Sequence, residues 1–143
     1  MQTTIRHMLQ VKGHDLWSVS PDTSVFDALR MMSDKDVGAL IIIKGDQMVG
    51  IMSERDYARK VVLLGKTSRD TKVSEIMSTN VYTIHPDQTV EEAMEIMNNK
   101  HIRHLPVVEG GKILGLISIG DVVKAIIYKQ REAIKDLEGK VAS

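Results

Sequence analysis

The sequence predicts a mixed fold of α+β or α/β class, in which two β-α-β-β-α repeats related by a pseudo-two-fold axis pack as one module. Residues 19–61 align with residues 84–126 without a gap at an offset of 65, and 11 of these 43 positions are identical. In both copies, apolar residues change from helical spacing to short continuous runs. Because one such unit cannot cover its own apolar face, we expect the two copies to share a core.

Each copy is predicted to open with a strand and a helix. The strands are residues 16–19 and 82–84, and each is followed by a Pro-Asp turn. Ser24 and Thr89 are helix-starting residues, and Thr89 is followed by a glutamate at the spacing of a capping box. Apolar residues then recur with the period of a helix that buries one face, at positions 25, 28, 29 and 32 and at positions 90, 93, 94 and 97.

A hairpin and a second helix complete each copy. Short β-branched runs at residues 39–43 and 105–108 are typical of buried strands, and glycine-containing turns connect them to returning strands at residues 48–52 and 113–117. The last helices begin near Glu54 and Ile119. The second helix is predicted to extend beyond the end of the repeat, with apolar residues at positions 123, 126, 127, 134, 137 and 141. This extension either packs on another subunit or is a partly unfolded, solvated tail.

Composition narrows the possible functions. The 143 residues carry 19 basic and 19 acidic side chains, so the sequence has no excess of positive charge with which to bind nucleic acid or an anionic membrane. The absence of cysteine excludes disulfides, thiolate zinc sites and cysteine nucleophiles. The first residues lack a signal-peptide core and no apolar run is long enough to cross a bilayer, so we expect a cytoplasmic protein.

The strongest chemical signal is a Gly-x-x-Ser-x-x-Asp motif that occurs twice, as GIMSERD at residues 50–56 and as GLISIGD at residues 115–121. Both copies lie where a strand becomes a helix. One interpretation is a helix cap, in which serine and aspartate serve the first turn. The other is a nucleotide site, because a helix N-terminus and a serine hydroxyl suit a phosphate, and a carboxylate suits two vicinal ribose hydroxyls. The duplication favours the nucleotide site.

Cationic residues are concentrated in the second copy. Arg103 and His104 precede its buried strand, whereas the equivalent residues of the first copy are Gly38 and Ala39. An arginine and a histidine can give charge-assisted hydrogen bonds to a phosphate. Arg55 can supply a cation in the first copy, or it can pair with a neighbouring acidic residue.

Other chemistry is disfavoured. The pair His101 and His104 has the spacing of metal ligands but no third ligand beside it, so we predict no metal site. The glycine pairs lack a phosphate-loop context. Without a nucleophile, base and orienting group, the motifs are suited to holding a ligand, and we predict no enzymatic activity.

Together these features resemble a tandem cystathionine-β-synthase (CBS) domain pair, a Bateman module. The residues that carry the resemblance are the P-D-x-[ST]-V-x-x-A starts at 21 and 86, the strands GALIII and RHLPVV, and the turns VGIMSERD and LGLISIGD. The resemblance implies a regulatory sensor that binds AMP, ATP, NAD or S-adenosylmethionine in clefts between the repeats. It also implies a homodimer, in which pairs join through their helices into a flat disc.

The resemblance also implies two sets of ligand residues. One cleft would use the turn of the second repeat and the start of a strand in the first, namely Ser118, Asp121, Arg103, His104, Gly120, Leu116, Val37, Gly38 and Ala39. The mirror cleft would use Ser53, Arg55, Asp56, Thr83, Ile102 and Arg103. Because Gly38 and Ala39 bring no cation to the mirror cleft, we expect one occupied cleft, with two different ligands as the alternative.

We therefore predict a non-enzymatic adenine-nucleotide sensor for signal transduction that acts on a separate effector protein. The alternatives are a scaffold with vestigial clefts and a nucleotide hydrolase or transferase. The expected ranges are residues 1–68 for the first repeat with the N-terminal segment, residues 69–130 for the second, and residues 131–143 for a C-terminal helical extension, with a polar linker at residues 65–71.

Overall fold

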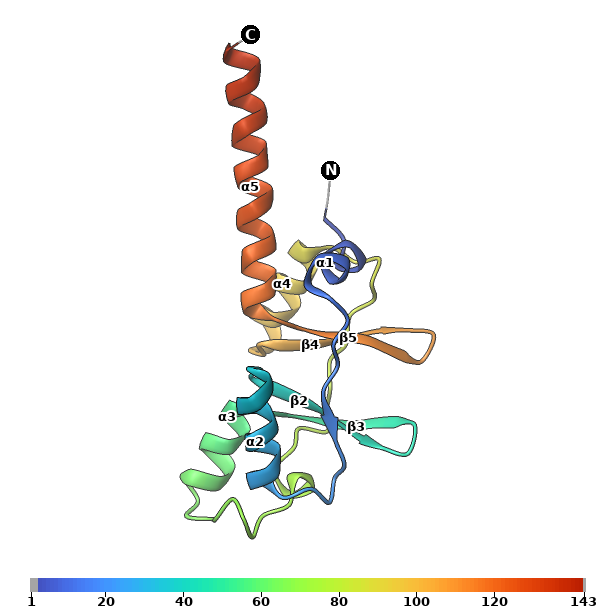
Figure 1. Cartoon of the computed structure of the whole chain (residues 1–143), viewed down its shortest axis with the longest axis vertical. Coiled ribbons are helices and arrows are strands. Elements are labelled where there is room, and N and C mark those ends of the chain that lie inside the picture. Colours follow the sequence, from blue (N-terminus) through green and yellow to red (C-terminus); the bar gives the residue numbers. More distant parts are fainter. Residues whose placement is uncertain (1–2, 143) are drawn as a thin grey trace. The chain divides into compact units, whose positions relative to one another are not determined.

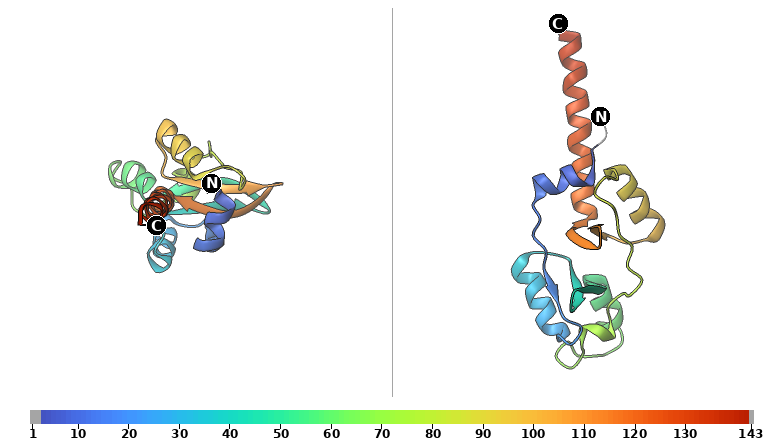
Figure 2. Two further views of the ribbon diagram at one scale, coloured as in Figure 1. Left: turned by 90° about the horizontal axis from the view of Figure 1, so that it is seen from above. Right: turned by 90° about the vertical axis from the view of Figure 1, so that its right-hand side faces the viewer.

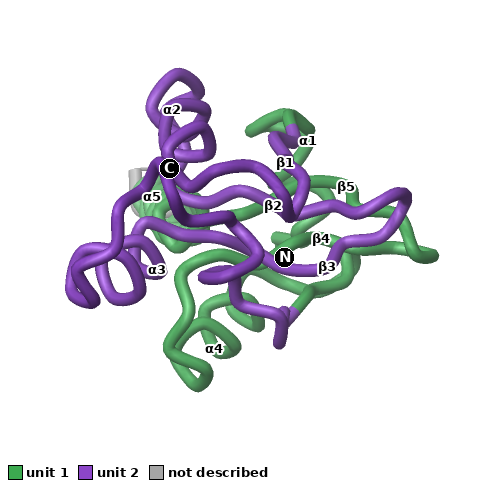
Figure 3. The backbone as a smooth tube through the Cα atoms, turned by 90° about the horizontal axis from the view of Figure 1, so that it is seen from below, with its two compact units in different colours: residues 1–15, 83–143 green, residues 16–82 purple. Residues whose placement is uncertain are grey.

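The computed structural model describes residues 3–142 and divides into two compact units. The first unit consists of residues 1–15 and 83–143, and the second consists of residues 16–82 (Figure 3). Each unit contains one of the two sequence repeats, and each has its own small sheet (Figure 1). The predicted β-α-β-β-α class is confirmed for the repeats.

The second unit is built on a three-stranded sheet of order β1-β2-β3. Strands β1 and β2 are parallel, and β2 and β3 form an antiparallel hairpin with a bulge at Ile42 and Ile43. Its elements are β1 (Ser18–Val19), α2 (Val25–Lys35), β2 (Ala39–Lys44), β3 (Gln47–Ser53), α3 (Glu54–Tyr57), a π-helical turn (Ala58–Val62) and a 3₁₀ turn (Val73–Glu75). The second helix of this repeat is therefore short and irregular.

The first unit repeats the hairpin and differs at both ends. Its elements are α1 (Ile5–Lys12), α4 (Val90–Lys100), β4 (His104–Glu109), β5 (Lys112–Ser118) and α5 (Ile119–Ala142). The hairpin of β4 and β5 carries its bulge at the equivalent place, between Val107 and Val108. The predicted strand at residues 82–84 is reduced to one parallel bridge, from Ile84 to Val107.

The predicted helix starts are confirmed by their caps. The side chain of Ser24 accepts a hydrogen bond from the backbone N–H of Asp27, and that of Thr89 accepts one from Glu92. These bonds satisfy amide donors that have no partner within the helix. Both helices end at equivalent left-handed residues, Asp36 and His101, with φ of 54° and 55°.

The apolar stripes predicted for these helices line the two cores. In the second unit, Val25, Ala28 and Met32 of α2 are buried in a cluster with residues of both hairpin strands. In the first unit, α4 buries the equivalent Val90, Ala93 and Met97. The helical period of apolar residues thus identified the buried face of both helices.

The N-terminal segment lies in the same compact unit as the second repeat. Helix α1 buries Ile5, Met8 and Leu9 within the first unit. The backbone N–H of Ile5 donates to the carbonyl of Gln88 at 2.8 Å. The segment packs here because its apolar residues complete a core that β4, β5 and α4 leave open.

The segment that precedes the second repeat behaves in the corresponding way. Residues 73–78 belong to the second unit, where Ser78 and Ile51 exchange backbone hydrogen bonds of 2.9 and 3.0 Å. Each repeat is therefore completed by the segment that precedes the other one. The predicted boundary at residues 68 and 69 does not coincide with the unit boundary, because residues 69–82 lie in the second unit.

Two equivalent glycines permit these close approaches. A Cβ atom at Gly50 would lie 2.7 Å from the Met77 sulfur and 3.0 Å from the Ser78 carbonyl oxygen. A Cβ atom at Gly115 would lie 3.0 Å from Leu9 Cδ2. The glycine of each Gly-x-x-Ser-x-x-Asp motif thus leaves room for the covering segment to pack closely against the returning strand.

Helix α5 continues far beyond the other elements of its unit. It spans 24 residues, and its C-terminal part extends past α1 and α4 (Figures 1 and 2). The predicted extension is therefore helical through Ala142. Among the residues from 3 to 142, no helix has the length and apolar character that crossing a membrane would require.

Candidate functional site

The repeat-two motif forms the turn from β5 into α5. The backbone N–H of Ser118 donates to Asp121 Oδ2 at 2.8 Å, and the N–H of Asp121 donates to Ser118 Oγ at 3.1 Å. These reciprocal bonds are the capping arrangement that the sequence allowed. They also hold the serine hydroxyl and the carboxylate together at the N-terminus of a long helix, where the partial positive charge favours an anion.

Lys12, at the end of α1, contacts the same carboxylate. Its Nζ lies 2.5 Å from Asp121 Oδ2 and donates to the carbonyl of Leu116 at 2.7 Å. Nearby, the ring of His14 hydrogen bonds to the carbonyl of Leu114 at 3.1 Å, so this segment follows β5. Lys12 could not be predicted from the repeats, because it lies outside the aligned residues and its equivalent residue, Met77, is apolar.

In the repeat-one motif, both oxygens of the carboxylate have protein partners. Asp56 Oδ2 accepts from the backbone N–H and the hydroxyl of Ser53, at 2.9 and 3.1 Å. Asp56 Oδ1 accepts from the Ser78 hydroxyl at 3.3 Å and pairs with Lys60 Nζ at 3.2 Å. Both oxygens are therefore occupied, and the Asp56 side chain is only 11% exposed.

This difference distinguishes two motifs that the sequence presents as equivalent. The contacts of the Asp121 carboxylate with Lys12 and with the Ser118 backbone both fall on Oδ2. The Asp121 side chain is 21% exposed, about twice as much as that of Asp56. The repeat-two carboxylate can accept hydrogen bonds from a ligand, whereas the repeat-one carboxylate is committed to its own fold.

The hairpin brings the predicted cations beside the repeat-two motif. His104 pairs with Ser118 across β4 and β5, and the carbonyl of Arg103 accepts from the backbone N–H of Ile119 at 2.8 Å. The Arg103 side chain is exposed. In repeat one, Gly38 and Ala39 occupy the same places beside Glu54 and Ser53. The repeat-two turn therefore has Arg103 and His104 beside it, where the repeat-one turn has Gly38 and Ala39.

His104 differs from the expectation that it contributes a positive charge. Burial of the ring lowers its pKa; the nearby Asp121 carboxylate raises it, and the charges of Lys12 and Arg103 lower it further, with a net decrease below the ordinary value. The neutral imidazole is therefore favoured at neutral pH. Arg103 and Lys12 then supply the positive charge beside this turn.

Asp121 is held in its ionised form. Partial burial alone would raise its pKa, but hydrogen bonds from Lys12 and from the Ser118 backbone, with the lysine charge, lower it below the ordinary value of 3.8. A carboxylate whose pKa is depressed by folding stabilises the folded state above its unfolded pKa, and this contribution is lost as the pH falls through the folded pKa.

We therefore expect the stability difference between the wild type and Asp121→Asn to depend on pH. The wild type is expected to be more stable than the variant at pH 7, and the difference is expected to shrink as the pH falls below about 4, because the wild-type carboxylate then becomes protonated. Urea unfolding of both proteins between pH 7 and pH 3 measures this. A difference that stays constant over the range would show that the charge of Asp121 does not contribute.

The remaining predicted ligand residues are divided between the units. Leu116, Gly120 and Ile102 lie around the repeat-two turn in the first unit, and Thr83 is exposed in the segment that precedes α4. Val37 and Arg55 lie in the second unit, where Val37 is half-buried and Arg55 is exposed on α3. Within the first unit, the structure thus brings together Ser118, Asp121, Arg103, His104, Gly120 and Leu116 around one turn.

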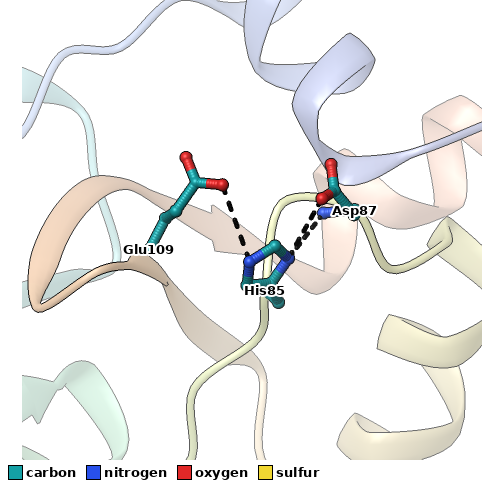
Figure 4. A group of neighbouring side chains, drawn as sticks. All are labelled: His85, Asp87 and Glu109. Atoms are coloured by element: carbon teal, nitrogen blue, oxygen red, sulfur yellow. Dashed lines mark hydrogen bonds and ion pairs between the residues drawn. The ribbon is translucent and has the colours of Figure 1, made fainter.

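A second cluster of polar side chains lies at the other end of the hairpin. His85, Asp87 and Glu109 place potential metal-ligand atoms within 4.8 Å of one another (Figure 4). The sequence analysis did not find this group, because its members come from two separate segments. The pair His101 and His104, which has metal-like spacing, is not part of any metal-ligand group found among residues 3–142.

The cluster is better described as an ion-pair network than as a metal centre. Arg6 Nη2 lies 2.8 Å from Glu109 Oε2 and 3.1 Å from Asp87 Oδ1, so a guanidinium already pairs with both carboxylates. The His85 Nδ1 atom accepts from the backbone N–H of Asp87 at 3.1 Å, which places the ring proton on Nε2. A metal at either ring nitrogen would break these interactions, so the residues present do not fit a cation.

Comparison with known proteins identifies the family. The model of the CBS domain matches this chain twice, over residues 10–63 and 73–128. The chain belongs to the CBS domain family and contains a tandem pair of these domains. The suspected resemblance is therefore confirmed.

Several relatives cover almost the whole chain. The mitochondrial CBS domain-containing protein CBSX3 of Arabidopsis thaliana is 38% identical over 97% of this chain, which spans 72% of CBSX3. A CBS-domain protein structure from Burkholderia ambifaria is 44% identical with a TM-score of 0.86, over 90% of this chain and 96% of that one. The CBS domain pair of MJ0100, solved with 5′-methylthioadenosine and S-adenosylmethionine, has a TM-score of 0.80 at 23% identity, over 90% of this chain and 99% of that pair.

Proposed function

We propose that this CBS domain pair is a regulatory module that binds an adenosine-containing ligand at the turn from β5 into α5. The observation that carries the proposal is the arrangement of Ser118 and Asp121, which presents a hydroxyl and an ionised, partly exposed carboxylate at the start of a long helix. These groups match the phosphate and ribose of a nucleotide. Regulation follows when the ligand has different affinities for two arrangements of the module.

Each residue of the turn has a distinct proposed role. Asp121 accepts hydrogen bonds from the ribose hydroxyls through Oδ1, while Lys12 stays on Oδ2. Ser118 and the backbone N–H groups at the start of α5 donate to the phosphate, and Arg103 neutralises its charge. Val37, Gly38 and Ala39 remain proposed contacts for the base.

We propose one ligand site, in repeat two. The Asp56 carboxylate of repeat one accepts from Ser53 and Ser78 and pairs with Lys60, so a ribose would have to displace protein donors. Ser53, Arg55, Thr83 and Ile102 are accordingly proposed for a weaker mirror site or for none.

The ligand class is supported by one neighbouring structure. The MJ0100 domain pair was solved in complex with two adenosine derivatives, which shows that this fold accepts the adenosine group in that protein. At 23% identity the similarity concerns the fold alone, so AMP, ATP, NAD and S-adenosylmethionine remain candidates of equal standing for this chain.

The proposal also covers enzymatic activity, oligomeric state, partner protein and location. We infer a non-enzymatic role, because a set of nucleophile, base and orienting group is not found around the turn among the described residues. We further infer a homodimer that acts on a separate effector protein, and a cytoplasmic location, although the relative CBSX3 is named as mitochondrial. The alternatives are a scaffold that binds no nucleotide and an enzyme that consumes it.

A thermal-shift panel with AMP, ADP, ATP, NAD and S-adenosylmethionine tests the proposal. A ligand at 100 times its dissociation constant adds about 2.7 kcal/mol of stability, which raises the unfolding temperature by several degrees. We expect at least one of these ligands to do so and to be recovered unchanged. No shift with any ligand would favour the scaffold, and loss of the ligand would favour the enzyme.

A further inference from the structure

Lys12, the last residue of α1, brings its ammonium group to the repeat-two turn. Its Nζ contacts Asp121 Oδ2, the same oxygen that accepts from the backbone N–H of Ser118 at 2.8 Å, and it donates to the carbonyl of Leu116 at 2.7 Å. Because the ammonium and the Ser118 amide bind one oxygen atom, the lysine charge lies beside the start of α5. The Lys12 side chain is 38% exposed, so this charge can act on a bound molecule.

The packing of α1 within the first unit fixes the position of Lys12. Leu9, three residues before it, is buried beside Gly115 of β5. Two residues after it, the His14 ring hydrogen bonds to the carbonyl of Leu114 at 3.1 Å. The backbone of Lys12 is therefore held on both sides along β5, which reduces the ordering cost of using its ammonium in ligand binding.

The ionised Asp121 carboxylate gives the lysine charge a role at the proposed site. A phosphate bound at the start of α5 would lie near this carboxylate, and two negative charges at short distance repel each other. Lys12 offsets the charge of Asp121, and Arg103 adds a further positive charge. Beyond the lowering by burial, the pKa of the His104 ring is raised by Asp121 and lowered by Lys12 and Arg103, so all three charges act around one residue.

The repeat-one turn has a different set of charges. Met77 is the residue equivalent to Lys12, and Gly38 is the residue equivalent to Arg103. The Asp56 carboxylate pairs instead with a lysine four residues further along its own helical segment. A lysine supplied by the segment that precedes the repeats thus distinguishes the repeat-two turn from its equivalent.

We propose that Lys12 is a specificity-determining residue, which selects adenosine ligands with an anionic phosphate at the 5′ carbon over adenosine itself and over S-adenosylmethionine. The inference rests on the proposed function, because it concerns the same site. Lys12 compensates the carboxylate charge that a phosphate meets, whereas a sulfonium cation at the same carbon is repelled by Lys12 and Arg103. AMP, ATP and NAD belong to the favoured class.

Calorimetric titration of the full chain with adenosine, AMP, ATP, NAD and S-adenosylmethionine tests the proposal. We expect at least one phosphate-containing ligand to bind the wild type about tenfold more tightly than adenosine or S-adenosylmethionine. In Lys12→Met, we expect this preference for the phosphate ligand over adenosine to fall about tenfold, because a charge-assisted interaction made with the phosphate alone is lost. The ratio of the two dissociation constants is the readout, since an effect on the fold or on the ribose contact would change both equally.

Two matched variants separate charge from other effects of the substitution. Lys12→Arg keeps the positive charge and is expected to retain the preference for the phosphate ligand. Lys112→Met removes an exposed lysine at the opposite end of β5 from Ser118 and is expected to leave both dissociation constants unchanged. Both lysines are at the surface, so folding is expected to be retained.

The outcomes distinguish this inference from the proposed function. If adenosine or S-adenosylmethionine bound the wild type as tightly as the phosphate ligands, the site would stand and the selectivity would be refuted. If Lys12→Met weakened adenosine and the phosphate ligand by the same factor, Lys12 would only support the fold or the Asp121 carboxylate. If none of the five ligands bound, the proposed function itself would be refuted.

Discussion

Asp121→Ala is expected to weaken binding of the adenosine ligand by about 1.5–3 kcal/mol, which corresponds to a roughly ten- to 150-fold higher dissociation constant. The loss follows because the carboxylate is ionised and partly exposed, and its contacts with Lys12 and the Ser118 backbone both fall on Oδ2, so Oδ1 can accept from a ribose hydroxyl. Isothermal titration calorimetry with the ligand identified by thermal shift measures the change.

A matched control separates this effect from a general change of charge. Asp34→Ala removes a carboxylate from the exposed surface of α2 and is expected to leave the dissociation constant unchanged. Because Asp121 also caps α5, the variant must first be shown to be folded by circular dichroism at the titration temperature. Unchanged affinity in folded Asp121→Ala would refute the ribose assignment.

Ile5→Ala is expected to lower the free energy of unfolding by about 2–5 kcal/mol, although the residue lies close to the N-terminus. Ile5 is 0% exposed and its backbone is hydrogen bonded to Gln88, so truncation leaves a cavity in the core of the first unit. Urea unfolding measures the change. The result would show that the segment before repeat one is an integral part of the unit that contains repeat two.

Val11→Ala is the control within the same helix. Val11 is 79% exposed, and its truncation is expected to change stability by no more than about 0.5 kcal/mol. If the two variants were equally stable, the packing of α1 against the second repeat would not contribute to folding.

The sequence predicted the repeats well because their signals are local. The helix starts at Ser24 and Thr89 and both hairpins appear where capping residues, apolar period and glycine turns placed them. The segments that complete each repeat could not be assigned from sequence. The apolar residues of α1 identify a helix face but not the core that it covers, and this core is formed by residues between Ile84 and Val122, on the other side of the first repeat in the sequence.

The candidate site was predicted in part for the same reason. The duplicated serine and aspartate were found because repetition marks them, but repetition also made the two motifs look equivalent. They differ through Lys12, Lys60 and Ser78, which reach the carboxylates from outside the aligned positions or from the next helical turn. The long-range contacts of Lys12 and Ser78 leave no periodic signal in a single sequence.

The most direct measurement is a crystal structure of the protein grown with the adenosine ligand that gives the largest thermal shift. We expect the ribose hydroxyls to lie within hydrogen-bond distance of the Asp121 carboxylate, roughly 2.5–3.2 Å, with the phosphate or its substituent at the start of α5 near Ser118. A ligand bound only at Asp56, or at a position that contacts neither carboxylate, would contradict the account.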